Sequence, residues 1–356
     1  MLIVIDARMI CASGIGTYIK NLIREIIESG DAKIHCIISN GDQELISSLG
    51  VTEYTIFKSK YFSPFEQIEY IFRLPRGDVF WTPHFNSPIF LPPRKFKARV
   101  ATIHDMFPFA YEKNFSKFKR FYIQTLIKMT CLLSDKILTV SNFSKSEIIK
   151  YLRVNAAKIH PFPLGVDPGF TLDRGASEKE NKYILCVGNI KPHKNLKRAI
   201  LAFSDIMDDI PDYKLILVGK SEGFYSPEVG LSDILKNSDR VIFTGFVSFE
   251  ELKEYYAGAS VLLFPSLYEG FGLPILEAMA FNLPIISSDR ASIPEVGGDS
   301  IVYINPEDRT DIGNKILEVV RGSAQCDIAN YEHIMTKFTW KNCAQNTINV
   351  IKNLIG

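Results

Sequence analysis

The sequence predicts an α/β fold made of two Rossmann-like, doubly wound domains. Twice in the chain a short apolar run passes into a turn that contains glycine and then into a helical pattern, first from Leu2 and again from Tyr183. Elsewhere short apolar runs alternate with helical patterns, which is typical of parallel sheets covered by helices. A length of 356 residues suits two domains of ordinary size.

Composition narrows the class of protein. Hydrophobic residues make up 46% and charged residues 23%, which indicates a folded, globular chain. No window of about twenty residues is free of charge, so no membrane-spanning helix is expected. The first residues lack the basic segment and cleavage site of a signal peptide. Six scattered cysteines without a C-x-x-C pair indicate reduced thiols and a cytoplasmic location.

Charge is divided unevenly along the chain, although the net charge is only +1. Residues 1–165 hold 22 Lys and Arg against 14 Asp and Glu, whereas the rest holds 19 against 26. A basic half suits nucleic acid or an anionic membrane surface. Residues 113–133 form a helical pattern with basic side chains among aromatic and aliphatic ones. Two interpretations stay open for it: a packed helix with a solvated basic face, or attachment to anionic lipid.

The first domain is expected at residues 1–167, a polar and aperiodic linker at 168–182, and the second domain at 183–340. Residues 141–144 (SNFS), rich in capping residues, are expected to start a helix that ends near Tyr151, and Asn195 is expected to cap the helix that begins at Leu196. The apolar runs of the first domain predict a helix at 17–27 and strands at 2–5, 33–39, 51–57, 99–103 and 136–140. Those of the second predict a helix at 310–320 and strands at 183–187, 214–218, 241–243, 261–264 and 283–287.

Residues 264–278 (FPSLYEGFGLPILEA) form the most informative segment. A buried strand ends at Phe264, a turn with two glycines follows, and Pro274 is expected at the first helical position, where its missing N–H costs nothing. The N-terminus of such a helix offers free N–H groups and the positive end of a dipole. This arrangement suits an anion such as a diphosphate.

Two glutamates flank that turn. Because a phosphate repels a carboxylate, Glu269 and Glu277 are expected to accept hydrogen bonds from hydroxyl groups, as on a ribose or a hexose. A nucleoside diphosphate sugar carries all of these groups. Taken singly, each glutamate also has a plain alternative, Glu277 as a favourable acid in the first helical turn and Glu269 as a solvated loop residue.

The strand at 99–103 ends in His104. Catalytic groups of open α/β sheets sit at the carboxyl ends of strands, so this histidine lies where chemistry would occur. The commoner alternative for a lone histidine is a strand cap or a hydrogen-bonded core residue.

Together these segments resemble the GT4 family of retaining glycosyltransferases, which have the GT-B fold of two Rossmann-like domains facing a central cleft. Residues 264–278 look like the family's E-x7-E signature and residues 102–108 (TIHDMFP) like its HD element. Residues 187–195 (VGNIKPHKN) are similar to its V-G-R-x-x-x-x-K-N pattern. The family's last helix, matched by residues 341–356, packs on the first domain.

The resemblance implies a role for each matched residue. His104, Glu269 and Lys194 are the expected catalytic residues: the first two contact the transferred sugar, and the lysine binds the donor diphosphate. Asn189 stands where the family has an arginine, which leaves Lys191, His193 and Arg198 as candidates for a second cation. The expected donor-binding residues are Gly16, Asn189, Lys191, His193, Lys194, Gly245, Tyr268, Gly270, Phe271, Gly272, Leu273 and Glu277.

The resemblance also implies transfer of a hexose with retention of configuration. No D-x-D triplet occurs in the sequence, which agrees with a site without metal; no cofactor is expected besides the nucleotide-sugar co-substrate. GDP-mannose is the best-matched donor and UDP-sugars the alternative. The expected acceptor is a glycan or lipid-linked saccharide of a bacterial surface polysaccharide, with no nucleic-acid partner. The expected location is cytoplasmic; under the lipid-attachment interpretation, residues 113–133 contact the inner face of the cytoplasmic membrane.

Two other classes stay open. The same scaffold could serve a nucleotide-sugar hydrolase or epimerase, or a non-catalytic partner of a transferase. The only support for a dehydrogenase is the G-x-G at Gly14 and Gly16, which is a weak signal.

Overall fold

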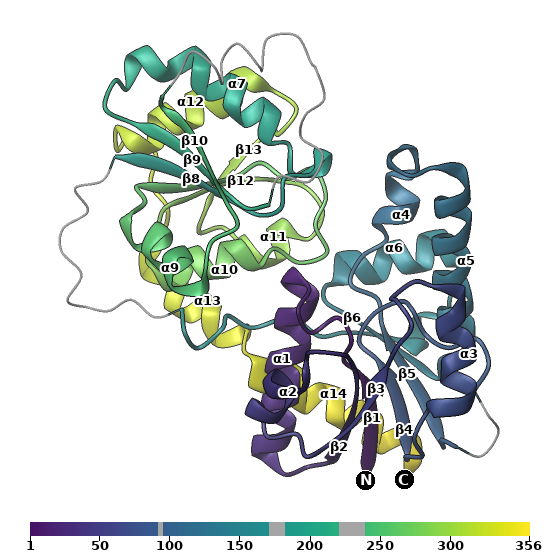
Figure 1. The fold of residues 1–356 in the computed structure, drawn as a ribbon. Helices are drawn as coiled ribbons and strands as arrows, with labels where there is room; N and C mark the ends of the chain where they lie inside the picture. Colours follow the sequence, from purple (N-terminus) through teal and green to yellow (C-terminus); the bar gives the residue numbers. More distant parts are fainter. Residues whose placement is uncertain (92–94, 171–181, 221–238) are drawn as a thin grey trace. The chain divides into compact units, whose positions relative to one another are not determined.

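The computed structural model describes residues 1–91, 95–170, 182–220 and 239–356. The chain divides into two compact units, one made of residues 1–165 and 338–356 and the other of residues 166–337 (Figure 1). Each unit has its own parallel sheet with helices around it. Most of the predicted linker, residues 171–181, lies outside the described residues.

The first unit is built on a seven-stranded sheet in the order β3-β2-β1-β4-β5-β6-β7, in which all neighbouring strands are parallel. Within it, β1 lies between β2 and β4, and its Ile5 is opposite Cys36 on one side and Trp81 on the other. Its strands are β1 (Leu2–Asp6), β2 (Lys33–Ser39), β3 (Glu53–Phe57), β4 (Val79–Thr82), β5 (Ala98–Thr102), β6 (Lys136–Thr139) and β7 (Ile159–Pro161).

Helices cover both faces of this sheet, with α1, α2 and α14 on one side and α3 and α5 on the other (Figure 1). The last helix is held beside the first, since the rings of Trp340 and Tyr18 lie 6.3 Å apart and Lys352 Nζ contacts Asp31 Oδ1 at 2.6 Å. The helical segments described in this unit are α1 (Ser13–Ser29), α2 (Gln43–Ser48), α3 (Pro64–Arg73), α4 (Phe107–Ala110), η1 (Glu112–Asn114), α5 (Lys117–Leu133), α6 (Asn142–Leu152), η2 (Ala156–Lys158) and α14 (Trp340–Ile355).

Local chemistry sets where these helices begin. Helix α6 starts within the predicted segment 141–144, where Ser141 caps it: its hydroxyl accepts a hydrogen bond from the Ser144 N–H at 3.0 Å. Helix α5 begins later than the pattern over residues 113–133 predicts. Ser116 has an extended backbone (φ −61°, ψ 152°), so the helix starts at Lys117 and residues 112–114 form a separate 3₁₀ turn.

The second unit is built on a six-stranded parallel sheet in the order β10-β9-β8-β11-β12-β13. Its strands are β8 (Tyr183–Val187), β9 (Lys214–Val218), β10 (Val241–Gly245), β11 (Val261–Phe264), β12 (Ile285–Ser288) and β13 (Val302–Ile304). The helical segments described are η3 (Pro192–Lys194), α7 (Leu196–Ile206), η4 (Met207–Asp209), α9 (Phe249–Gly258), α10 (Leu273–Ala280), α11 (Ile293–Gly297), α12 (Arg309–Val320), η5 (Ile328–Asn330) and α13 (Tyr331–Lys337).

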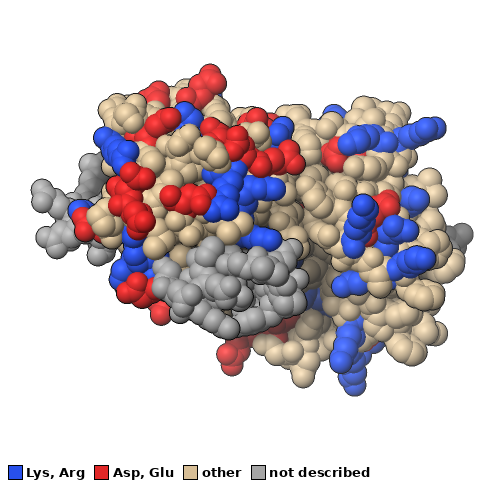
Figure 2. Space-filling model, turned by 90° about the horizontal axis from the view of Figure 1, so that it is seen from above, with Lys and Arg blue, Asp and Glu red and all other residues tan. Residues whose placement is uncertain are grey.

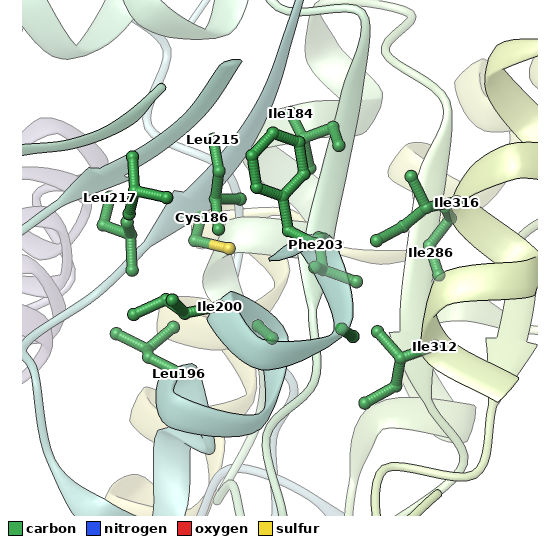
Figure 3. Packing of buried hydrophobic residues seen from close by; sticks show 14 of the residues in the cluster. Ile184, Cys186, Leu196, Ile200, Phe203, Leu215, Leu217, Ile286, Ile312 and Ile316 are labelled. Atoms are coloured by element: carbon green, nitrogen blue, oxygen red, sulfur yellow. The ribbon is translucent and has the colours of Figure 1, made fainter. Parts of the chain in front are cut away.

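Helices α7 and α12 bury their apolar faces against this sheet (Figure 3). On α7 the buried residues Leu196, Ile200 and Phe203 recur at helical spacing, so they form one face. They meet Cys186 of β8 and Ile312 of α12 in the hydrophobic core of this unit. The predicted fold class, two doubly wound α/β domains, is confirmed.

In each sheet the chain reverses its direction of growth at one place, between β1 and β4 in the first unit and between β8 and β11 in the second. Open α/β sheets bind ligands at the carboxyl ends of the strands at such switch points. The loops after β1, β4, β8 and β11 are therefore the places where functional residues are expected.

Two glycines of α1 give a matched test of the packing beneath one of these loops. A Cβ added to Gly16 would lie 2.3 Å from Ile10 O, whereas one added to Gly14 would meet nothing within 4 Å. We expect Gly16→Ala to lower the free energy of unfolding by about 1–3 kcal/mol. Gly14→Ala should instead raise it by up to about 1 kcal/mol, because alanine favours helix. Urea denaturation measures both, and equal effects would contradict this packing.

Candidate active site

The loop after β8 brings Lys194 to the carboxyl edge of the second sheet. Gly188 leaves the strand with φ 137°, and a 3₁₀ turn carries the chain to Lys194. Asn195 comes directly before α7, but its backbone is left-handed (φ 57°) and its side chain makes no cap, so that prediction is wrong. Its Nδ2 instead donates to Pro265 O at 3.1 Å and Pro306 O at 2.7 Å, joining three loops of this edge.

The loop after β11 carries Glu269 and is held in place by buried serines. Ser292 Oγ donates to the carbonyl oxygens of Glu269 and Phe271 at 2.9 and 2.8 Å, and Ser288 Oγ donates to Ser266 O at 2.5 Å. Ser266 Oγ in turn donates to Glu269 Oε1 at 2.5 Å. The carboxylate therefore sits on a loop whose backbone is tied to β12 and α11.

The two loops meet in an ion pair. Lys194 Nζ lies 2.5 Å from Glu269 Oε1, and the Leu267 N–H donates to His193 O at 2.8 Å. The ammonium also lies 5.4 Å from the centre of the Phe264 ring. Both charged side chains stay partly accessible, at 18% and 13% exposure. Since an ammonium has three N–H donors, the pair leaves Lys194 able to bind a further anion.

Glu277 lies in the second turn of its helix, not in the first turn, where an acid would interact favourably with the helix dipole. Gly272 (φ 116°) precedes α10, which begins at Leu273, so Pro274 is the second helical residue and no acid stands in the first turn. Tyr256 Oη donates to Glu277 Oε2 at 2.6 Å. Burial, opposed by this hydrogen bond, raises the pKa of Glu277 to about 7. A half-buried carboxylate in the second turn is not explained as a favourable charge for the helix dipole.

The neighbours of Lys194 differ in what charge they can supply. Burial, with the positive charge of Lys194, lowers the pKa of His193 to about 4, so this imidazole is neutral at pH 7. Arg198 Nη1 donates to Asn195 Oδ1 and Pro306 O, both at 2.9 Å, and thereby braces the loops. Lys191 is exposed. Of the three candidates for a second cation, Lys191 fits best.

The remaining predicted donor residues of this unit present backbone more than side chain. Tyr268 and Phe271 bury their rings, while Gly270, Gly272 and Leu273 lead into the first turn of α10. In that turn Pro274 has no N–H, and the Ile275 N–H donates to Gly272 O at 3.0 Å. Asn189 follows Gly188 at the end of β8. Gly245 (φ 74°) ends β10, and its carbonyl accepts a hydrogen bond from the Gly219 N–H at 2.9 Å.

The first unit holds the other two predicted site residues. His104 lies just after β5, and its Nε2 is 2.9 Å from Pro83 O. A carbonyl only accepts, so Nε2 carries the proton; burial lowers the pKa of His104 to about 4 and keeps the ring neutral. Gly16 lies inside α1, where its N–H already donates to Ala12 O. The closeness of Ile10 O explains by packing alone why a glycine is needed at this position. A contact of Gly16 with the donor stays a prediction.

Sequence reasoning missed a buried charge network at the switch point of the first unit. Arg8 donates from Nε and Nη2 to both oxygens of Asp6 at 2.8 and 2.7 Å, and from Nη1 to Glu66 Oε2 at 3.0 Å. Tyr70 Oη donates to Asp6, and Asn86 Nδ2 to Glu66 Oε1 at 2.8 Å. All four carboxylate oxygens thus accept a hydrogen bond. The charged pair D-x-R at the end of β1, Asp6 and Arg8, was the available signal.

The serines and Tyr256 around the second-unit site were missed for a different reason. A buried hydroxyl needs a hydrogen-bond partner, so the run ISSDRAS at residues 286–292 could have indicated loop clamps. The partner of Tyr256 lies 21 residues away, and no local pattern indicates it.

The described residues form neither a metal cluster nor a membrane-spanning helix. In these ranges no three His, Cys, Asp or Glu side chains are grouped so that they could hold a metal ion. No described helix combines the length and apolar character that a bilayer crossing requires. A reaction without metal or further cofactor stays a prediction.

The raised pKa of Glu277 gives a stability test. The carboxyl holds its proton up to about pH 7 in the native chain but only to the ordinary value of 4.5 when unfolded. Native stability therefore falls as the pH rises through this window. Glutamine carries no charge, so Glu277→Gln should gain about 2–3 kcal/mol of unfolding free energy over the wild type between pH 5 and pH 8. Urea denaturation at both pH values measures it; a pH-independent difference would contradict the shift.

Two family models cover almost the whole chain. Residues 12–170 match the model described as Glycosyltransferase Family 4, and residues 171–333 match Glycosyl transferases group 1. The O-antigen chain mannosyltransferase B of Escherichia coli is 30% identical over 286 residues, 76% of this chain and 74% of that protein. The O-antigen chain mannosyltransferase RfbU of Salmonella typhimurium is 35% identical over 248 residues, 69% and 67% of the two chains.

A solved structure extends the likeness to the full length. Anabaena Alr3699/HepE, in complex with UDP-glucose, is similar with a TM-score of 0.75 at 14% identity, covering 99% of this chain and 100% of that one. At this identity the likeness shows the fold alone, and the predicted GT-B class is confirmed. The predicted enzyme class and family resemblance are confirmed by the family models and the relatives. This chain belongs to the glycosyltransferases that combine a family 4 first half with a group 1 second half.

Proposed function

We propose that this glycosyltransferase moves mannose from GDP-mannose to a glycan or lipid-linked saccharide, with retention of the anomeric configuration. The observation that carries the proposal is the ion pair of Lys194 with Glu269, with Glu277 near enough for the charge of Lys194 to act on its carboxyl group. Together they supply a cation for a diphosphate and two carboxylates for hydroxyl groups. The names of two relatives, both O-antigen mannosyltransferases, support the sugar. GDP is supported by the likeness of residues 191–195 to mannosyltransferases.

In the proposed reaction the bond between the anomeric carbon and the β-phosphate oxygen breaks. A bond to the acceptor oxygen forms on the same face of the sugar, and the departing phosphate oxygen takes the acceptor's proton. Lys194 and the N–H groups at the start of α10 stabilise the charge that develops on the diphosphate. Lys191 supplies a second positive charge.

The carboxylates and the histidine position the sugars. Glu269 keeps one oxygen on Lys194 and offers the other to hexose hydroxyls. Glu277 accepts hydrogen bonds from the ribose when it is ionised, so donor binding should strengthen as the pH rises through about 7. His104 is neutral with its proton on Nε2, which leaves the Nδ1 lone pair to accept a hydrogen bond from the transferred sugar.

The acceptor class also implies a place in the cell. A lipid-linked saccharide lies at a membrane surface, so we place the enzyme peripherally at the inner face of the cytoplasmic membrane. Helix α5 is the contact proposed from sequence, and its exposed residues Lys117, Lys119 and Lys128 support it.

A thermal-shift titration with GDP, UDP, ADP, GDP-mannose and NAD tests this function. A ligand that binds only the native chain raises the melting temperature. We expect GDP and GDP-mannose to raise it more than UDP or ADP, and Glu277→Ala to lose the response. Glu250→Ala, which removes an exposed glutamate of the same unit, should keep it. A response to UDP alone would reassign the donor to a UDP-sugar, and a response to NAD alone would overturn the proposal.

A further inference from the structure

Helix α3 exposes a row of large apolar side chains. Phe65, Ile68 and Phe72 are between 53% and 79% exposed. They are three and four residues apart, so they lie on one face of the helix. The opposite face holds buried Glu66 and Tyr70, which join the Arg8 network. The buried face thus fixes the helix and turns its apolar row outward.

Helix α5 repeats this arrangement. Phe118, Phe121 and Leu132 are between 71% and 91% exposed, while Ile123 and Ile127 pack into the core of the first unit. Phe121 and Leu132 lie three and fourteen residues after Phe118, which places the three exposed side chains on one face of the helix. Neither exposed row is needed to pack its helix onto the sheet, since each helix has a separate buried face.

The two rows belong to one region of the first unit. Helices α3 and α5 lie on the same side of the sheet (Figure 1), and both hold the segment 85–89. Gln67 Oε1 of α3 accepts a hydrogen bond from the Ile89 N–H at 2.8 Å, and Thr130 Oγ1 of α5 donates to Phe85 O at 2.6 Å. The aromatic surface defined by both rows comprises Phe65, Ile68, Phe72, Phe118, Phe121 and Leu132.

Basic side chains accompany this surface. On the first unit, at the right of Figure 2, Lys and Arg side chains are spread over the face seen from above, with few acidic ones between them. Two acids on or beside these helices are paired with basic residues, Glu112 with Arg120 at 3.0 Å and Glu69 with Arg73 at 3.4 Å. The basic residues on or next to the two helices are Arg73, Arg76, Lys113, Lys117, Lys119, Arg120 and Lys128.

The composition decides between kinds of partner. Exposed apolar patches of this kind mark interaction surfaces. Protein interfaces deplete lysine, whereas surfaces that enter a membrane interface combine Phe and Leu with Lys and Arg that meet anionic headgroups. We propose that the aromatic surface, formed by α3 together with α5, inserts into the headgroup region of an anionic phospholipid bilayer. This deepens the membrane contact within the proposed function, and adds a second helix to it.

Vesicle co-sedimentation of the full chain tests the two-helix surface without donor or acceptor. The probes are vesicles of phosphatidylcholine alone and with phosphatidylglycerol. We expect binding to the anionic vesicles, and a loss of about tenfold or more in affinity for Phe65→Ser/Phe72→Ser on α3 and, separately, for Phe118→Ser/Phe121→Ser on α5. Phe246→Ser is the matched control, since it removes an exposed phenylalanine of the second unit and should leave binding unchanged.

Each other outcome overturns the inference. Unchanged binding of the α3 variant would exclude α3 from the contact, and equal binding to both vesicle types would exclude the basic residues. No binding by the wild type would exclude a bilayer. A wild-type dimer in size-exclusion chromatography that Phe65→Ser/Phe72→Ser converts to a monomer would assign the surface to a second copy of the chain. The GDP thermal shift of each variant checks its fold and tests the donor site independently of the membrane result.

Discussion

The ion pair between Lys194 and Glu269 is the interaction on which the candidate site depends. It joins the loops after β8 and β11 at the switch point of the second sheet. Either charge alone in this half-buried place would lose much of its hydration without a partner. As an ion pair the two charges stabilise each other in this partly buried place. Serine hydroxyls and Asn195 fix the loops around them. An anion that reaches this edge finds an ammonium already in position.

The first unit uses the same topology for a different purpose. Its switch point holds Arg8 between Asp6 and Glu66, all of them buried, and each carboxylate oxygen accepts a hydrogen bond. The side chains of this network are almost fully buried, at 0–1% exposure, so a ligand cannot reach them, and the network anchors α3 so that its apolar row faces outward. Lys194 and Glu269 differ in being partly accessible. Residual exposure, rather than the presence of charge, separates the binding pair from the structural one.

The sequence predicted the sheets well because buried parallel strands are short apolar runs, and β2, β8 and β9 have the predicted bounds. It also placed Glu269 and Lys194 at neighbouring strand ends. The prediction failed where a residue type can serve two structural roles and only the contacts of the folded chain decide between them. Asn195 donates hydrogen bonds to distant carbonyls instead of capping its helix. At Gly16, the carbonyl of Ile10 in the preceding loop leaves no room for a Cβ. Apolar rows such as that of α3 look like core faces until burial is known.

Calorimetric titration of GDP and GMP into the wild type and Lys194→Ala measures the central claim most directly. GDP carries the β-phosphate that Lys194 is proposed to hold, whereas GMP lacks it. Lys194→Ala should weaken GDP binding by about 10–100-fold and GMP binding far less, while Lys253→Ala, which removes a lysine paired with Glu250, should change neither. GDP binding that is unchanged in Lys194→Ala, or weakened no more than that of GMP, would contradict a diphosphate site at this ion pair.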